Sequence, residues 1–162
     1  MGNLRLCDAK DRNEMATIIN RAAERYRGTI PSDRWQEPYM PAAELDHEVA
    51  SGVEFHGFAE GNRLLGVMGI QPVADVHLIR HAYVLPEAQG QGIGGQLLRH
   101  LIAECPTRIL VGTWAAASWA IDFYARHGFV MVAHDKIPVL LRRYWDIPSR
   151  QVETSVVLSH HP

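Results

Sequence analysis

Residues 77–105 read HLIRHAYVLPEAQGQGIGGQLLRHLIAEC, which predicts a strand, a glycine-rich turn and a helix. The segment from His77 to Leu85 is rich in aliphatic, β-branched and aromatic residues, and Pro86 ends it because proline has no amide hydrogen to donate. Apolar residues then recur at the three- and four-residue spacing of an amphipathic helix, at Ile93, Leu97, Leu98, Leu101 and Ile102.

The turn between this strand and this helix has the composition of an anion-binding loop. Residues 89–95 read QGQGIGG, with four glycines in six positions. Glycine has no Cβ, so the backbone can approach a ligand closely, and the free amides and dipole of a helix N-terminus attract negative charge. We therefore expect a phosphate or pyrophosphate group to bind here.

Two known nucleotide-binding motifs match this turn only in part. A P-loop requires Lys followed by Ser or Thr, and the chain contains no such pair. Gly90-x-Gly92-x-x-Gly95 matches a dinucleotide fingerprint, but that motif also needs an acidic residue near the end of the next strand. The next predicted strand, residues 108–114, contains no Asp or Glu. A dinucleotide fold and a purely structural turn remain as alternatives.

Two segments resemble the GNAT superfamily of N-acetyltransferases. Gln89-x-x-Gly92-x-Gly94 is similar to the family's acyl-CoA signature, and residues 120–129, AIDFYARHGF, are similar to its A-x-x-F-Y-x-x-x-G-F segment. Both occur in the family's order and at its separation. The resemblance covers residues 77–132 and implies an α/β fold with a mixed, largely antiparallel sheet flanked by helices.

The resemblance implies acetyl-CoA as co-substrate and suggests how the chain would hold it. The backbone of the turn would bind the pyrophosphate, and the end of the preceding strand would pair with the pantetheine arm, leaving an amide free at a bulge. Ser118 would replace a family asparagine that is Ala117 here. The expected cofactor-binding residues are Ala82, Tyr83, Val84, Gln89, Gly90, Gln91, Gly92, Ile93, Gly94, Gly95, Ser118 and Tyr124.

The resemblance also suggests the catalytic residues. Tyr124 matches the family tyrosine beside the CoA sulfur, and a phenol can give a proton to a departing thiolate; the alternative is a core tyrosine paired with Phe123. The family's usual glutamate position is Leu78 here. His81 is our candidate base, with His77 on the same strand face by period two, and Glu54 or a water relay as further options.

The acceptor is expected to be a small amine. In the family the segment between the first two helices covers the acceptor site, and here residues 30–41 contain Arg34, Trp35 and Tyr39. With Trp114 these side chains suggest an aromatic pocket with a cation for a substrate carboxylate. The alternative is that Trp35 and Tyr39 only cover an edge of the core.

Composition limits the other classes of function. The chain has 162 residues, 47% apolar and 21% charged, with a net charge of −2, which favours one domain over residues 1–162 and gives no reason to expect nucleic acid. No apolar run is long enough for a membrane span. Two cysteines and scattered histidines do not predict a metal site. We expect a cytoplasmic protein.

The remaining pattern predicts the order of the elements. Strands are expected near residues 4–7, 55–60, 64–71, 77–85, 108–114, 129–133 and 151–158, with turns at 61–62 and 72–75. Helices are expected near 14–25, 42–51, 93–105 and around Tyr124, and a short helix or loop over 138–145. The final strand, Val152 to Leu158, could pair across chains and so form a homodimer.

Together these features predict an N-acetyltransferase that moves an acetyl group from acetyl-CoA to the primary amine of a small molecule by direct transfer in a ternary complex. The main alternative is a non-catalytic acyl-CoA-binding or sensing domain of the same fold. A nucleotide-binding regulatory domain is the second alternative.

Overall fold

The computed structural model describes residues 2–162. Five short 3₁₀ turns, at residues 9–11, 24–26, 32–34, 86–88 and 134–136, separate longer elements. These longer elements are β1 (Gly2–Leu6), α1 (Arg12–Ala23), α2 (Ala42–Ala50), β2 (Glu54–Glu60), β3 (Arg63–Val73), β4 (Val76–Val84), α3 (Ile93–Glu104), β5 (Ile109–Trp114), α4 (Ser118–Arg126), β6 (Val130–Met131), α5 (Ile137–Tyr144), α6 (Ser149–Glu153) and β7 (Ser155–His160).

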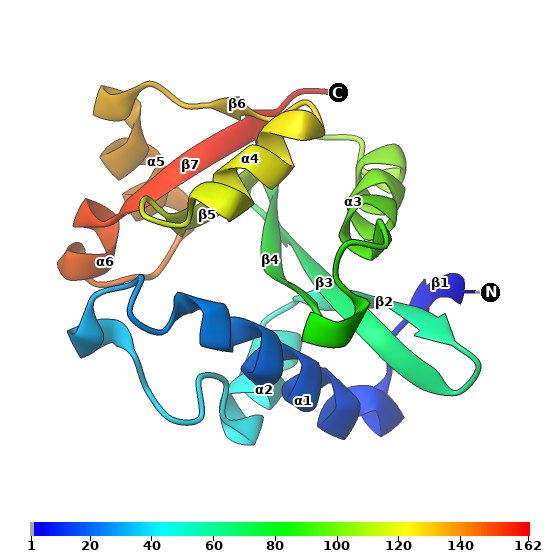
Figure 1. The fold of residues 1–162 in the computed structure, drawn as a ribbon. Coiled ribbons are helices and arrows are strands. Elements are labelled where there is room, and N and C mark those ends of the chain that lie inside the picture. The colour runs from blue at the N-terminus through cyan, green and yellow to red at the C-terminus, as the bar shows by residue number, and fades with distance from the viewer. Residues whose placement is uncertain (1) are drawn as a thin grey trace.

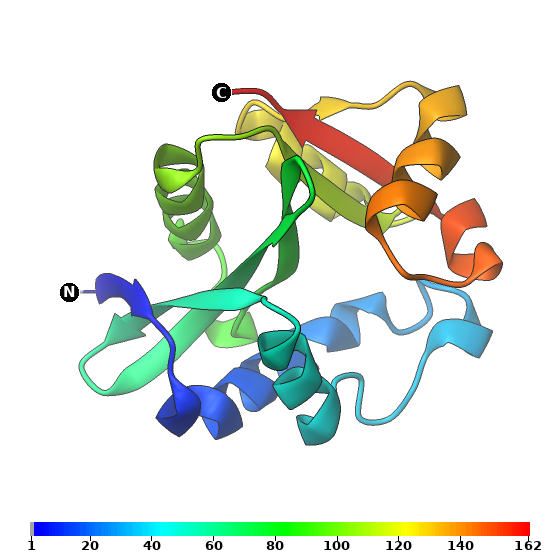
Figure 2. The same ribbon diagram turned by 180° about the vertical axis from the view of Figure 1, so that it is seen from behind.

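One seven-stranded sheet forms the centre of the molecule, in the order β1-β2-β3-β4-β5-β7-β6. All neighbours are antiparallel except β4 and β5, which run parallel. Helices flank the sheet, with α1 and α2 on one side of β2–β4 and α3 on the other (Figures 1 and 2). The predicted α/β class with a mixed, largely antiparallel sheet is confirmed.

The apolar stripes of the first and third helices are buried as their spacing predicts. In α1 the stripe is Met15, Ile18, Ile19, Ala22 and Ala23, all buried. In α3 four of the five stripe residues are buried and pack into the main core. Burying each of the larger side chains, the Met, Ile and Leu residues of these stripes, stabilises the fold by about 1.5–3 kcal/mol, which fixes α1 and α3 against β3 and β4.

The antiparallel meander β2–β3–β4 also forms as predicted, with one difference. Gly61 and Asn62 make the expected two-residue turn between Glu60 and Arg63. The second turn was expected over 72–75, but β3 continues through Pro72 to Val73, and only Ala74 and Asp75 form the turn. Proline is tolerated at position 72 because the strands end there.

The C-terminal strand begins later than predicted. Residues 151–153, expected to be strand, belong to helix α6, which follows Pro148 and buries Val152. Strand β7 covers 155–160 and pairs with β5 along its whole length and with β6 at Leu158 and Ser159. Because β7 lies between β5 and β6, it is not an edge strand, and a homodimer formed through it stays a prediction.

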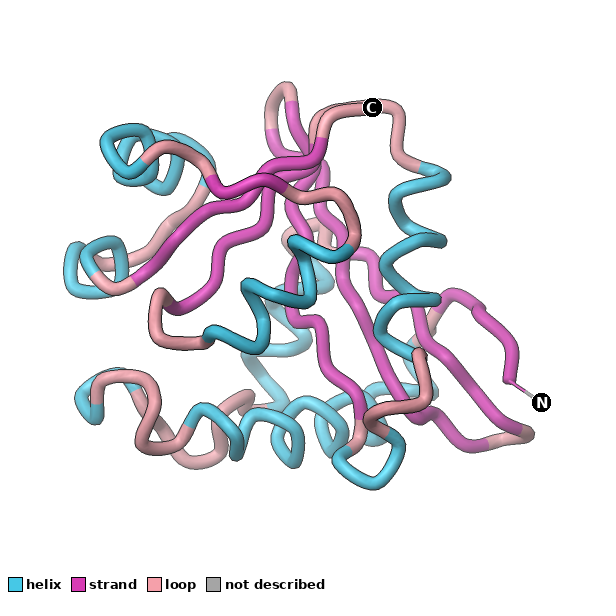
Figure 3. The backbone as a smooth tube through the Cα atoms, turned by 45° about the horizontal axis from the view of Figure 1, so that its top comes forward, coloured by secondary structure: helices cyan, strands magenta, loops and turns pink. Residues whose placement is uncertain are grey.

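The sheet opens between its two halves. Strands β4 and β5 pair over only three residues, from His77 opposite Ile109 to Ile79 opposite Val111. Beyond these residues the strands diverge, so that the two halves of the sheet meet at one end and splay at the other (Figure 3). A bulge lies beside this opening, since Met68 on β3 faces two residues, His81 and Ala82, on β4.

A bidentate ion pair between Arg5 and Asp11 links β1 to the start of α1. Both terminal nitrogens of Arg5 lie 2.9 Å from the carboxylate of Asp11, which also accepts the amide of Asp8 at 2.8 Å. The hydrogen bond from Arg5 is the main reason why the pKa of the Asp11 carboxyl falls from 3.8 to about 2. Asp11 is buried, so this shift contributes to the free energy of unfolding.

We expect Asp11→Asn to lower the free energy of unfolding by up to about 2 kcal/mol at neutral pH. Because the pKa of Asp11 is depressed in the fold, its contribution is complete above about 3.8 and disappears as the pH falls through about 2. Denaturant unfolding across this range should therefore show the wild type and variant converging in acid. Asp46→Asn, which removes a surface pairing with Arg12, is the control and should cost less than about 1 kcal/mol. A constant difference between wild type and Asp11→Asn down to the lowest pH would contradict the assignment.

Candidate functional site

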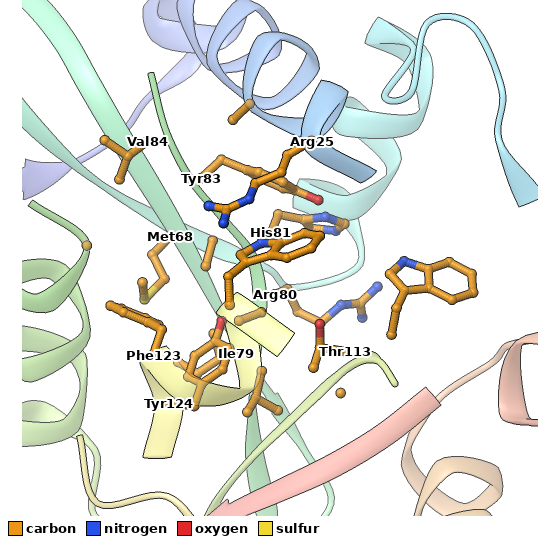
Figure 4. A pocket seen from close by; sticks show the side chains of 18 of the residues that line it. Arg25, Met68, Ile79, Arg80, His81, Tyr83, Val84, Thr113, Phe123 and Tyr124 are labelled. Atoms are coloured by element: carbon orange, nitrogen blue, oxygen red, sulfur yellow. The ribbon is translucent and has the colours of Figure 1, made fainter. Parts of the chain in front are cut away.

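A cavity of about 810 Å³ occupies the opening between β4 and β5. Its walls come from β4, the glycine turn, α3, β5 and α4, and its rim includes residues of α1 and of the segment before α2. Figure 4 shows side chains from these elements converging on this space. The cavity therefore lies where the sequence places its two most informative segments.

The glycine turn has the geometry expected of an anion site. Gly90 and Gly92 both have φ near +80°, a conformation that favours glycine, and Gly92 immediately precedes helix α3. The first amides of α3, at Ile93, Gly94 and Gly95, have no acceptor within the helix, as at any helix start. All three of these residues line the cavity, so a phosphate group placed there would meet a helix N-terminus.

The next two glycines allow α3 to approach α4. A Cβ on Gly94 would lie 3.4 Å from the ring of Phe123, and one on Gly95 would lie 3.0 Å from Nε2 of His127. Because neither position has a side chain, the N-terminus of α3 can lie close to α4 and to the His127 ring that follows it. Gly95 therefore serves close helix packing as well as the cavity.

The charge of the cavity wall matches a polyphosphate ligand. Four arginines, Arg25, Arg80, Arg99 and Arg126, line it, and Asp122 is the single acidic residue among the described lining residues. Arg99 lies one helical turn after Gly95 and contacts His127, with 3.4 Å between Nη1 and Nε2. The excess of positive charge on the cavity wall fits a ligand that carries several negative charges.

The wall formed by β4 contains the residues expected to pair with an extended ligand. Ala82, Tyr83 and Val84 all line the cavity on the side that has no strand neighbour. The bulge expected near these residues lies at His81 and Ala82. The amide side chain of Gln89 donates to the carbonyl of Val84 at 3.1 Å, which ties the glycine turn to the end of the strand.

Tyr124 projects from α4 into the same cavity (Figure 4). Its ring packs against Phe123 and Phe129 at centroid distances of 5.1 and 5.5 Å, and only 6% of the residue is exposed. Burial, followed by the nearby phenol of Tyr26, raises the pKa of Tyr124 well above its ordinary value. The hydroxyl is therefore protonated at neutral pH and is available as a proton donor.

The two histidines of β4 have different environments. His81 lines the cavity, and its Nε2 lies 3.0 Å from Oε1 of Glu48 on α2. His77 was expected on the same face, but it lies outside the lining residues, with Nδ1 2.6 Å from the hydroxyl of Thr107. The bulge at His81 breaks the two-residue alternation on which that expectation rested. Glu54 also lies away from the cavity, paired with His56.

The acceptor residues divide into two groups. Tyr39 and Trp114 line the cavity, whereas Trp35 and Arg34 do not. Trp35 packs against Tyr39 at 5.5 Å, and Arg34 donates to the side chain of Gln151 at 3.3 Å. Trp35 and Arg34 therefore contact lining residues without lining the cavity themselves.

A group of aromatic rings lines part of the cavity. Tyr26 is the centre of this group, with ring centroids 6.3 Å from Tyr39, 6.4 Å from Tyr83 and 5.5 Å from Trp119. The guanidinium of Arg25 lies 4.3 Å from the Trp119 ring centroid. Burial raises the pKa of Tyr26 to about 12, so its hydroxyl stays neutral.

Two of the expected cofactor residues lie outside the lining residues, and several lining residues were not foreseen. Gln91 and Ser118 are exposed beside the cavity. Arg99 was predictable in principle, because it follows Gly95 by one helical turn. The contact between Glu48 and His81 spans 33 positions, and no sequence periodicity indicates it.

The part of the chain that is described contains no cluster of three or more His, Cys, Asp or Glu side chains arranged to hold a metal ion. Cys7 and Cys105 are free and half-buried. None of the helices between residues 2 and 162 has both the length and the apolar character needed to cross a membrane.

Comparison with known families and structures agrees with this geometry. Residues 51–131, half of the 162-residue chain, match the family model described as an acetyltransferase (GNAT) domain. This segment includes the glycine turn, β4, β5 and Tyr124. No curated protein sequence matches the chain.

Solved structures resemble the whole chain at low identity. An acetyltransferase of the GNAT family from Staphylococcus aureus has a TM-score of 0.74 and 15% identity over 99% of both chains. The PaiA N-acetyltransferase of Thermoplasma acidophilum, solved with coenzyme A, has a TM-score of 0.77 and 15% identity over 100% of this chain and 99% of its own. The ribosomal-protein-S18-alanine N-acetyltransferase of Escherichia coli has a TM-score of 0.71 and 18% identity over 99% of this chain and 94% of its own. At these identities the likeness establishes the fold.

Proposed function

Since the chain belongs to the GNAT family of acetyltransferases, we propose that it transfers the acetyl group of acetyl-CoA directly to the primary amine of a small-molecule acceptor. The observation that carries the proposal is the convergence of the glycine turn, the open side of β4 and the hydroxyl of Tyr124 on one cavity. We further propose that residues 1–162 act as one catalytic domain, which the single sheet running through residues 2–162 supports.

The residues present fit acetyl-CoA as the co-substrate. The amides of Ile93, Gly94 and Gly95 would hold the pyrophosphate, and Arg99 and Arg126 supply further positive charge. Backbone groups of β4 from Ala82 to Val84 would hold the pantetheine amides. When bound, acetyl-CoA supplies the activated acetyl group.

Two side chains would move the protons of the reaction. His81 would take a proton from the acceptor's ammonium group, which exposes the nitrogen lone pair that attacks the thioester carbonyl. Tyr124 would give its proton to the departing sulfur. Burial raises the pKa of this tyrosine, and the departing thiolate would be in the same buried surroundings, which raise its proton affinity too.

The cavity favours a compact acceptor with an apolar or aromatic body. Tyr26, Tyr39, Trp114 and Trp145 contribute rings to its lining, and its single carboxylate, among the described residues, is that of Asp122 on α4. A polyamine or aminoglycoside would need several carboxylates to balance its charge. We therefore propose a monoamine, contacted directly by Tyr39 and Trp114, with Trp35 and Arg34 supporting that wall.

The proposal is tested by measuring thiol release from acetyl-CoA across aromatic monoamines, amino acids, polyamines, aminoglycosides and peptides. Thermal shifts with acetyl-CoA, CoA, NAD and ATP are measured in parallel. We expect stabilisation by the CoA species and thiol release with a monoamine. Stabilisation without turnover on any acceptor would favour a sensing domain, and stabilisation by NAD or ATP alone would overturn the proposed ligand.

A further inference from the structure

His81 has an unusual backbone conformation for its residue type. Its φ is +55°, in the left-handed region that favours glycine. A non-glycine residue held there costs about 1–3 kcal/mol and persists only where its surroundings enforce it. Here the conformation belongs to the bulge opposite Met68, and it leaves the imidazole on the cavity wall rather than in the alternating pattern of the strand.

A carboxylate from another element holds this imidazole. Oε1 of Glu48 on α2 lies 3.0 Å from Nε2 of His81 and 3.2 Å from Nη2 of Arg80. The side chains of Glu48 and His81 are only 13% and 16% exposed, so solvent screens the contact weakly. Burial raises the pKa of Glu48, but the hydrogen bond from His81 and the charge of Arg80 outweigh it, and the net pKa lies below its ordinary value.

The ionised carboxylate fixes the tautomer of the imidazole. A carboxylate can only accept hydrogen bonds, so Nε2 must carry the hydrogen. In neutral His81 the lone pair then lies on Nδ1, which Glu48 does not contact. The same logic, in which the partner of one ring nitrogen decides the role of the other, applies to histidines in many sites.

We propose that Glu48 is a positioning residue that holds His81 in the Nε2-protonated tautomer, with Nδ1 as the base that accepts the acceptor's proton. This inference rests on the proposed acetyl transfer. The N–H bond of the ammonium group breaks, the proton binds Nδ1, and the resulting imidazolium keeps its Nε2 hydrogen bond to Glu48. Solvent removes the proton after transfer, so no other reagent is needed.

The other groups around His81 are consistent with this assignment. Arg80, from the same strand, is held by Gln71 of β3 at 3.0 Å as well as by Glu48. Phe55 of β2 stacks on the imidazole at 6.0 Å. His47 precedes Glu48 on α2, and the other titratable residues that line the cavity are Arg25, Tyr26, Tyr39, Tyr83, Arg99, Asp122, Tyr124, Arg126 and His127.

A second histidine–glutamate pair shows which feature matters. His56 lies 2.9 Å from Glu54, a distance close to that between His81 and Glu48, but neither residue of that pair lines the cavity. Pairing with a carboxylate is therefore not distinctive by itself. The Glu48–His81 pair differs because a bulge places its imidazole beside the open side of β4.

The test is the pH dependence of kcat/KM for the wild type, Glu48→Gln, His81→Gln and Asp46→Asn. Glutamine at position 48 keeps the shape and an acceptor for Nε2 but removes the charge. We expect Glu48→Gln to lower kcat about 10-fold, because a neutral amide can donate to Nε2 as well as accept from it and so no longer holds the imidazole in one tautomer. His81→Gln should remove the acidic limb of the profile, and Asp46→Asn, which changes an exposed carboxylate on the same helix, should leave the profile unchanged.

A measurement that needs no turnover accompanies these rates. Nitrogen-15 chemical shifts of His81 should report the Nε2-protonated tautomer in the wild type and a mixture in Glu48→Gln. An unchanged kcat in Glu48→Gln, or an Nδ1-protonated tautomer in the wild type, would overturn the inference. If the wild type binds acetyl-CoA but releases no thiol with any acceptor, acetyl transfer itself fails, and the tautomer measurement still decides whether Glu48 positions His81.

Discussion

Tyr124→Phe is expected to lower kcat about 100-fold while changing the dissociation constant for CoA by less than about twofold. The substitution removes one hydroxyl from a buried ring that packs between Phe123 and Phe129 and leaves those contacts in place. If that hydroxyl protonates the departing thiolate, its loss slows the chemical step and not the binding step. Single-turnover kinetics and calorimetric titration with CoA would separate the two.

Tyr144→Phe is the matched control for this variant. Tyr144 is also a buried tyrosine, but its hydroxyl donates to Asp75 at 2.6 Å, away from the cavity. Its loss should lower the melting temperature and leave kcat unchanged. If Tyr124→Phe turned over at the wild-type rate, Tyr124 would have no part in the mechanism.

The second large effect is expected at the glycine turn. Gly92→Val should weaken CoA binding about 100-fold, the equivalent of losing one or two charge-assisted hydrogen bonds to phosphate. A Cβ on Gly92 would meet no atom within 4 Å, so the effect is not a clash. It arises because a β-branched residue does not tolerate φ near +80°, and relaxation of the turn redirects the amides at the start of α3.

Gly28→Val separates backbone strain from ligand binding. Gly28 has the same φ of +80° and the same open surroundings, but it lies outside the cavity lining. Both variants should therefore lose similar stability in thermal melts, and only Gly92→Val should lose affinity for CoA. Equal affinities in the two variants would show that the turn does not hold the pyrophosphate.

Local sequence signals predicted much of this fold. The stripes of α1 and α3, the Gly61-Asn62 hairpin and the glycine turn each depend on residues within about ten positions of one another, and each formed where expected. The boundary between α6 and β7 was missed because residues 151–158 alternate apolar and polar side chains. Burial of Val152 beside α5 favours one short helical turn at that place over further strand.

The site was predicted less completely, for a physical reason. The glycine turn and Tyr124 belong to contiguous motifs. Glu48, the partner of His81, lies on helix α2, which is distant in the sequence. The bulge that places His81 on the cavity wall depends on the register of β3 and β4. Neither a register shift nor a contact across 33 positions leaves a periodic trace in one sequence.

The three-residue junction between β4 and β5 also has a consequence for how the chain reaches its fold. Strands β2, β3 and β4 are joined by two-residue turns, so their contacts close with little loss of loop entropy. The parallel junction must instead bring together segments separated by residues 85–108. We expect the meander to form early and the junction late, which makes the opening that holds the proposed active site among the last features to be assembled.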